Sequence, residues 1–265
     1  MTLPVLRRSA DRKVTNAVSP NGKTAKVANS FGLPSGKPFS CPGATSVCEK
    51  VCYAGKLEKI YSGVRNVLMS NWDAVKDASL DDMVSMLQAM IDDFRADCIK
   101  EDARRAKKGD GPVQRAFRIH WDGDFFSVNY AAAWAWVIAG NRDIHFWVYT
   151  RSFTGPVDVL PVFGGMADRS NLSLYLSVDT ANRADAIRAR VAYPWVKVAW
   201  LDETFADGRA NMPAFTGENG KPAKSYPCPE NGGRIALIDE KGSACIKCGI
   251  CPKGRGDVLF SIRKR

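Results

Sequence analysis

The sequence contains little histidine and no long apolar stretch. Only two of its 265 residues are histidine, at positions 120 and 145. No run of eighteen apolar residues occurs, so we expect no helix that spans a bilayer and no membrane partner. The first eight residues lack the apolar core of a signal peptide, and we therefore expect a cytoplasmic protein. Hydrophobic residues make up 45% and charged residues 25% of the chain, which excludes wholesale disorder and allows a packed core.

Cysteine, by contrast, is frequent, with 8 residues. In a chain without an export signal, this number predicts metal or redox chemistry instead of a disulfide framework. Most of the cysteines fall into two groups. The N-terminal cysteine group is Cys41, Cys48 and Cys52, and the C-terminal cysteine group is Cys228, Cys245, Cys248 and Cys251. The remaining one, Cys98, lies within a predicted helix, and we expect it to be a small buried apolar side chain.

The C-terminal cysteine group has the stronger metal-binding pattern. Its last three cysteines are separated by two residues each and followed by Pro252. Successive thiolates can then turn around one centre, as in part of a ferredoxin-type [4Fe–4S] ligand run, with Cys228 as the distant fourth ligand. Structural zinc also takes four cysteines and is the competing metal, although zinc usually takes two separated Cys-x2-Cys pairs.

The N-terminal cysteine group offers three ligands and no fourth nearby. Because a [4Fe–4S] cluster takes four ligands, three cysteines leave one iron free to hold a small molecule, unless a thiolate from elsewhere completes the cluster. The three cysteines could instead be structural, or share a single site with the C-terminal cysteine group. The sequence therefore predicts one or two [4Fe–4S] clusters.

The hydrophobic pattern predicts three regions: a basic N-terminal segment with a cysteine loop (1–56), a barrel-like core (57–202) and a cysteine-rich C-terminal segment (203–265). Helical spacing covers 57–77, and Ser79 can cap a second helix. Strands at 115–120, 144–150, 172–178 and 195–201 then alternate with helices at 127–140, 156–166 and 181–192. This alternation predicts a parallel α/β sheet, which right-handed crossovers would curl into a complete or partial barrel. After residue 201, only 234–238 and 258–262 read as strands, and the latter can return to the sheet.

Polar side chains follow each predicted strand of the core. Because the carboxyl ends of parallel strands meet at one rim, we expect a binding site there. The catalytic candidates are His120, Asp122, Asp124 and Arg151, and the cofactor-binding candidates are Trp121, Gly123, Thr150, Ser152, Ser177 and Asp179. The carboxylates could bind an amino group or ribose hydroxyls of a ligand, and Arg151 could bind a carboxylate or a phosphate. Trp121 could stack on a planar ligand. Helix capping is the alternative for Ser127, Ser152 and Asp179, which precede helix starts.

The net charge of +10 is unevenly distributed. Residues 1–60 hold ten basic and three acidic residues, and residues 203–265 hold eleven basic and seven acidic residues. Residues 61–202, by contrast, are nearly balanced, with seventeen basic and eighteen acidic residues. Basic excess attracts nucleic acid or a phosphorylated small molecule. It can also offset the negative charge of a thiolate-bound cluster. No helix-turn-helix, zinc-finger or RNA-binding signature is present, so sequence-specific readout of nucleic acid is not supported.

Four motifs in a fixed order carry a family resemblance. They are CEKVCYA at 48–54, RIHWDGDFFS at 118–127, FWVYTRS at 146–152 and the closing cysteines of the C-terminal cysteine group. Together they resemble the phage gene-product-88-like family, whose members occur in bacteriophages and bacteria. That family is in turn distantly similar to the radical S-adenosylmethionine iron–sulfur proteins, which have a cysteine loop after the first strand, a partial α/β barrel and polar strand ends that hold S-adenosylmethionine.

The resemblance implies an iron–sulfur protein of the host cytoplasm with a radical-S-adenosylmethionine-like partial barrel. It further implies S-adenosylmethionine as a cofactor and a redox or modification enzyme, an oxidoreductase or transferase. The loop spacing Cys-x6-Cys-x3-Cys departs from the usual Cys-x3-Cys-x2-Cys of those enzymes. The first alternative is a non-enzymatic iron–sulfur protein that binds nucleic acid through its basic end segments. The second is a zinc-stapled α/β protein with an unrelated activity.

Overall fold

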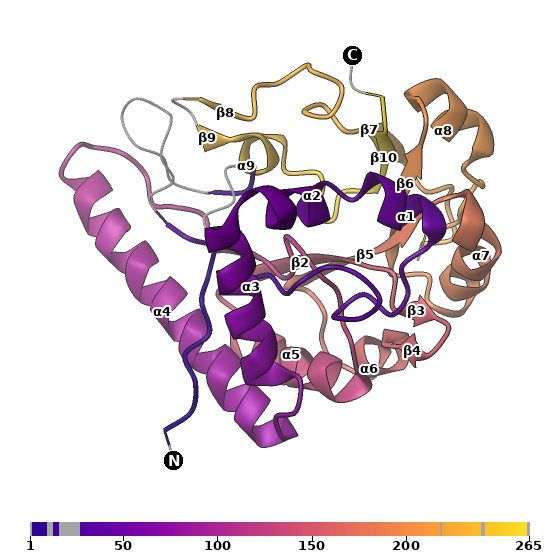
Figure 1. Cartoon of the computed structure of the whole chain (residues 1–265). Coiled ribbons are helices and arrows are strands. Elements are labelled where there is room, and N and C mark those ends of the chain that lie inside the picture. Colours follow the sequence, from indigo (N-terminus) through magenta and orange to yellow (C-terminus); the bar gives the residue numbers. More distant parts are fainter. Residues whose placement is uncertain (1, 10–12, 16–26, 218, 240–241, 264–265) are drawn as a thin grey trace.

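The computed structural model describes residues 2–9, 13–15, 27–217, 219–239 and 242–263, which are built on one six-stranded sheet (Figure 1). Every neighbouring pair of its strands is parallel. The predicted α/β class with a parallel sheet is therefore confirmed. The strand order is β1 (Ala116–Arg118), β2 (His145–Thr150), β5 (Leu172–Val178), β6 (Lys197–Asp202), β10 (Asp257–Ser261) and β7 (Ser225–Pro227).

The described sheet is open. Its first four strands lie in chain order, so right-handed crossovers place the connecting helices on one face. These helices are α5 (Val128–Gly140), α6 (Leu160–Gly164) and α7 (Arg183–Ala192). Strands β1 and β7 lie at opposite edges and do not pair in the described residues. The complete barrel, one of the two expected forms, is thus not seen there, and the partial barrel stays a prediction.

One face of the sheet, the helix face, packs against the helices. Side chains alternate between the two faces along a strand, and the apolar ones on this face enter the main core. The long helix α4 (Leu80–Ala106), capped by Ser79 as predicted, packs on α5, and its Cys98 is fully buried. Burying each large side chain contributes about 1.5–3 kcal/mol, so this layer is a main source of stability. The helix-face core residues are Phe117, Phe146, Val148, Leu174, Leu176, Val198, Trp200 and Leu259.

The opposite face, the cavity face, is covered by segments from both ends of the chain. In Figure 1, α1 (Ser46–Val51), α2 (Tyr53–Ile60) and α9 (Ala244–Cys248) lie on the side of the sheet away from α5 and α6. A second, smaller core forms here, and it includes two thiols of the C-terminal cysteine group. Its buried members are Val14, Ala116, Trp147, Tyr175, Ala199, Cys228, Cys251 and Val258.

An extended segment, residues 29–33, runs beside the outer edge of β1. The Phe31 N–H donates to the Arg118 carbonyl at 3.1 Å, and the Arg118 N–H donates to the Asn29 carbonyl at 2.9 Å. The bridge between Ser30 and Arg118 is parallel. The segment therefore acts as an irregular edge strand, and the chain passes directly from it into the loop that carries the N-terminal cysteine group.

Several smaller elements differ from the predictions. The helical stretch 57–77 is two helices, α2 and α3 (Ser62–Val75), separated by the extended residue Tyr61. A hairpin of β3 (Phe153–Thr154) and β4 (Val157–Asp158) occupies the start of the predicted helix at 156–166, because Gly155 turns the chain at φ +78°. The 3-10 turn η1 (Thr180–Asn182) precedes α7. Beyond residue 201, the chain also forms α8 (Phe205–Asn211), β7, β8 (Ile238–Asp239) and β9 (Gly242–Ser243), and β10 joins the sheet as predicted.

No helix among the described residues is both long enough and apolar enough to cross a membrane.

Replacing Gly123 should destabilise the fold, whereas replacing Gly63 should not. Gly123 has φ +81°, and a Cβ there would lie 2.4 Å from Ser40 Oγ and 2.8 Å from the Leu33 carbonyl oxygen. We expect Gly123→Ala to lower the free energy of unfolding by about 2–4 kcal/mol. Gly63 lies in α3 with no heavy atom within 4 Å of a Cβ, so Gly63→Ala should raise it by up to about 1 kcal/mol. Urea unfolding of the two variants measures both changes, and equal effects would contradict this account.

Candidate functional site

A cavity of about 450 Å³ lies between the cavity face, the N-terminal cysteine loop and the C-terminal segment. This volume lies within the range of small-molecule sites, roughly 300–1,000 Å³. All the predicted metal ligands line it: Cys41, Cys48, Cys52, Cys228, Cys245, Cys248 and Cys251. Two segments about two hundred residues apart in the sequence thus bring their thiols to one space.

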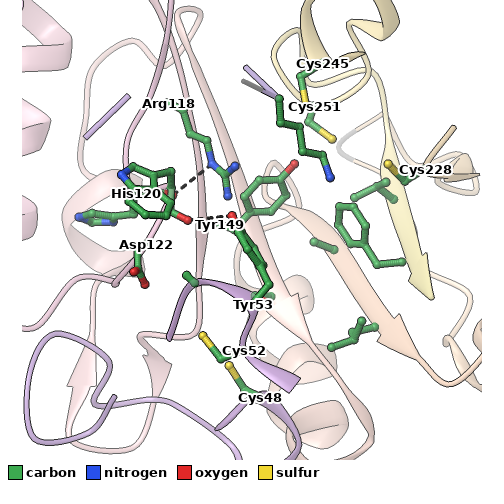
Figure 2. Close-up of a pocket in the computed structure, with 18 of the residues that line it drawn as sticks. Cys48, Cys52, Tyr53, Arg118, His120, Asp122, Tyr149, Cys228, Cys245 and Cys251 are labelled. Carbon is green, nitrogen blue, oxygen red and sulfur yellow. Dashed lines mark hydrogen bonds between the residues drawn. The ribbon is translucent and has the colours of Figure 1, made fainter. Parts of the chain in front are cut away.

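The thiols keep two separate groups inside the cavity. Figure 2 shows Cys48 and Cys52 together at one end and Cys228, Cys245 and Cys251 at the other, with two tyrosine rings between them. None of the cysteines forms a disulfide. Within each group the thiols interact electrostatically, Cys48 with Cys52 and Cys251 with both Cys228 and Cys248. This arrangement favours two centres over one shared site.

Burial favours the neutral form of five of the seven thiols when no metal is bound. It raises the pKa of Cys41, Cys48, Cys228 and Cys245, and it raises the pKa of Cys251 to about 12. A metal that binds here must therefore displace protons and supply the compensating positive charge. In the described part of the chain, no group of three or more His, Cys, Asp or Glu side chains has a geometry that could hold a metal ion. The donor chemistry fits a thiolate centre, and binding requires the thiols of a group to turn toward a common point.

The N-terminal cysteine loop is anchored to the ends of two strands. Thr45 caps α1 by accepting from the Cys48 N–H, and its hydroxyl donates to Asp179 Oδ2 at 2.6 Å. Arg151 donates to the same oxygen at 2.8 Å. The backbone at Gly43 packs so closely on Arg151 that a Cβ would lie 2.3 Å from its carbonyl oxygen. The predicted site residues Arg151 and Asp179 therefore position the loop, and Asp179 also caps η1 as the capping alternative predicted.

Three other predicted site residues form a closed hydrogen-bond network. Asp124 accepts from the Thr150 hydroxyl at 2.6 Å, the Arg151 N–H at 2.6 Å and the Phe125 N–H at 2.7 Å. Burial raises the pKa of Asp124 to about 6. The Ser152 hydroxyl donates to the Phe125 carbonyl at 2.6 Å, while its N–H donates to Thr150. These contacts hold the strand ends in place, although Asp124 also borders the cavity.

The segment His120–Gly123 forms one wall of the cavity. His120 has a positive φ of 49°, and its Nε2 lies 3.0 Å from the Tyr130 hydroxyl. Burial, aided by the charge of Arg118, lowers the pKa of His120 to about 3, so its imidazole is neutral. Burial, followed by the neighbouring carboxylate of Glu58, raises the pKa of Asp122 to about 8. Trp121 and Ser177, both cofactor-binding candidates, also line the cavity.

Sequence reasoning missed the residues between the two cysteine groups. Figure 2 places Arg118, Tyr149 and Tyr53 there, with the Arg118 guanidinium 5.3 Å from the centroid of the Tyr149 ring. The Tyr53 hydroxyl donates to the Trp121 carbonyl at 2.9 Å. The alternation along β1 and β2 could have placed Arg118 and Tyr149 on one face, but nothing in the pattern indicates which face is hollow.

A second missed residue, Lys13, lies beside the C-terminal cysteine group. Its ammonium is 2.5 Å from Glu230 Oε2, and its carbonyl accepts from the Cys245 N–H at 3.1 Å. Burial acts to lower the pKa of Lys13, but the negative charges of Cys245, in its thiolate form, and of Glu230 outweigh burial and raise the pKa. Lys13 therefore carries a positive charge next to these thiols.

The neutral state of His120 predicts a loss of stability in acid. The unfolded chain protonates this imidazole near pH 6.5, whereas the folded chain does so only near pH 3. The part of the stability that His120 contributes therefore falls as the pH drops below 6.5, by about 2 kcal/mol between pH 7 and pH 5. The raised pKa values of Asp122 and Asp124 act in the opposite direction, and they are present in a His120→Gln variant as well. On going from pH 7 to pH 5, the free energy of unfolding of His120→Gln should therefore change more favourably than that of the unaltered protein, by about 2 kcal/mol. Urea unfolding at both pH values measures the difference, with His145 present in both proteins. Equal changes would show that His120 titrates normally in the fold.

Comparison with known proteins supports the family resemblance seen in the motifs. The family described as Gene product 88 matches residues 4–254. The Gene 88 proteins of Mycobacterium phages L5 and D29 are each 46% identical, over 263 and 264 residues, which is 98% of this chain and 99% of each relative. No solved structure matches the chain. Because the match extends over nearly the whole length of the chain and of both phage relatives, the chain belongs to the gene product 88 family.

Proposed function

We propose that this protein is an iron–sulfur enzyme with two clusters facing one substrate cavity. The C-terminal cysteine group would hold one [4Fe–4S] cluster with four thiolates, and the N-terminal cysteine group would hold a second with three. The observation that carries the proposal is that the seven thiols, which come from opposite ends of the chain, line a single cavity in two separate groups. Purely structural cysteines would not need to gather around an open space.

The surrounding charges suit anionic clusters. Each cysteine group has a buried or partly buried cation beside it, Arg151 near Cys48 and Lys13 near Cys245. Each cation is held by a carboxylate, Asp179 for Arg151 and Glu230 for Lys13. Such cations partly offset thiolate charge and raise a cluster's reduction potential. Zinc in the C-terminal cysteine group is the competing assignment, and metal analysis separates the two.

Three features support a radical-S-adenosylmethionine type of enzyme. The N-terminal cysteine loop follows the extended segment 29–33, much as the cysteine loop follows the first strand in those proteins. The strands beside it lie in chain order in a parallel sheet. A three-thiolate cluster leaves one position for a small molecule, and Trp121, Asp122 and Ser177 border the same cavity. The bound groups would supply one-electron chemistry, while the chain's own residues bind and orient the ligands and exclude water.

Cysteine variants should divide the metal content between the two groups. In protein purified anaerobically, Cys48→Ser should remove about half of the iron and sulfide, and Cys248→Ser should remove the other half, because each cluster has its own ligands. Cys98→Ala is the matched control, since Cys98 is buried in α4 away from the cavity. It should retain the full content. If either serine variant lost all the iron, one shared centre would be indicated. Zinc without sulfide in the unaltered protein would refute the iron–sulfur assignment.

Cleavage of S-adenosylmethionine tests the enzyme class. Anaerobic protein given S-adenosylmethionine and excess dithionite should release methionine and 5′-deoxyadenosine. In this cleavage the C5′–S bond of the sulfonium breaks, dithionite supplies two electrons in one-electron steps, and solvent supplies the proton that C5′ takes up. Cys48→Ser should abolish product formation, and Cys98→Ala should leave it unchanged. Chromatography of the quenched mixture measures both products. An intact cluster content with no 5′-deoxyadenosine would favour the non-enzymatic iron–sulfur protein.

A further inference from the structure

Unpaired positive charge lies along α1, α2 and the start of α3, and it reaches the cavity at Lys56. We call Lys50 of α1, Lys56 and Lys59 of α2 and Arg65 of α3 the basic rim; all four are exposed. Lys56 itself lines the cavity. None of the four forms an ion pair within the described residues. Across residues 46–65, the only exposed carboxylate is Glu49.

The basic rim differs from the cations of the neighbouring long helix. On α4, Arg95, Lys100 and Arg104 each pair with a carboxylate three residues earlier in the same helix. Such pairing gives an electrically balanced, solvated surface. The other carboxylate of residues 46–65, Glu58 of α2, cannot balance the basic rim in the same way, because it is buried and accepts from the Ser35 N–H and hydroxyl. The basic rim therefore keeps a net positive field.

Two exposed aromatic rings are interleaved with these cations. Tyr53 is 53% exposed and Tyr61 is 56% exposed. Residues three or four apart are neighbours on a helix surface, so Tyr53 lies beside Lys56 on α2, and Tyr61 lies beside Arg65 at the start of α3. The Arg65 N–H donates to the Tyr61 carbonyl at 3.1 Å, which fixes that second pair in one helical turn. Tyr53 lines the cavity as well, so the aromatic and basic surface continues into it.

We propose that the basic rim and its two tyrosines bind a single strand of nucleic acid, and that nucleic acid is the substrate class of the enzyme. Cations that follow a phosphate backbone, alternating with rings on which unpaired bases stack, are the usual surface for single strands. Bases in a duplex cannot stack on the tyrosines without being unpaired, so a single strand is preferred. The cavity beside the rim, with Tyr149 and Phe260 in its wall, then receives a base. The assignment of nucleic acid as substrate rests on the proposed enzyme function. The binding of a single strand by the basic rim does not depend on that function.

Affinity and its salt dependence test the basic rim. Fluorescence anisotropy with a labelled single-stranded oligothymidine should show binding that weakens steeply with salt. The triple variant Lys56→Ala, Lys59→Ala, Arg65→Ala should bind at least tenfold more weakly. Its plot of log affinity against log salt should be shallower by about 2, since each phosphate contact to a single strand contributes about 0.7. Tyr61→Ala should weaken binding roughly tenfold with an unchanged slope, because stacking carries no charge.

A charge-matched control separates the basic rim from general electrostatics. Arg183→Ala, Arg188→Ala and Arg209→Ala remove the same charge from exposed positions on α7 and α8, whose apolar side chains pack in the helix-face core. This variant should bind the oligonucleotide within about threefold of the unaltered protein, because its three charges lie on helices that carry no part of the basic rim and would act only through the screened field. Equal losses in the two triple variants would overturn the proposal. So would tighter binding of the matched duplex, or binding to anionic phospholipid vesicles without binding to the oligonucleotide.

The same samples distinguish failure of the basic rim from failure of the enzyme. Iron and sulfide are measured in each preparation before the binding experiment. If a chain that holds zinc and no sulfide binds the oligonucleotide, the proposal that the basic rim binds a single strand is supported and the iron–sulfur enzyme assignment is refuted. A fully loaded iron–sulfur chain that binds no oligonucleotide at low salt refutes the basic rim and leaves the enzyme assignment standing.

Discussion

A parallel sheet has apolar side chains on both faces, and both faces must be covered for the sheet to be stable. In this protein the helices cover one face with a continuous apolar core. The other face is covered by loops and by the short helices α1, α2 and α9 from the two ends of the chain, and these segments carry seven thiols. Because short helices joined by loops fill a sheet surface less completely than the longer helices of the opposite face, a space remains between them and the sheet. The cavity and the gathering of the cysteines thus have one structural cause.

Regular elements with strong periodicity could be predicted well. The strand at 172–178 has the bounds that its apolar run indicated, and Ser79 and Ser127 cap their helices as their position before an apolar pattern suggested. The extended segment 29–33 could not be predicted, because its conformation is set by hydrogen bonds to β1 about ninety residues later in the sequence. The short hairpin at 153–158 was missed because Gly155 and Pro156 also fit the start of a helix.

The position of the polar residues at the strand ends could be predicted from the sequence, but their roles could not. Sequence order places Asp124, Thr150 and Asp179 at one rim, and the structure joins them there: Thr150 donates to Asp124, and Arg151 links Asp124 to Asp179. Their hydrogen bonds, however, go to other parts of the chain, where they hold the strand ends and the cysteine loop. A carboxylate that caps a turn and one that binds a ligand look the same in a sequence, because the difference lies in long-range partners. Similarly, the positive charge of the N-terminal region acts at two places, beside the thiols and along the basic rim, which only the fold separates.

We propose that the two cysteine groups hold two iron–sulfur clusters at opposite ends of one cavity. The most direct measurement is the stoichiometry of iron and acid-labile sulfide in protein purified without oxygen, with an electron paramagnetic resonance spectrum of the reduced state. Two four-iron clusters require about eight iron atoms and about eight sulfides per chain, and the reduced sample should give a cluster signal. Zinc bound by the C-terminal cysteine group, with no sulfide and no cluster signal, would show that the two cysteine groups do not hold iron–sulfur clusters.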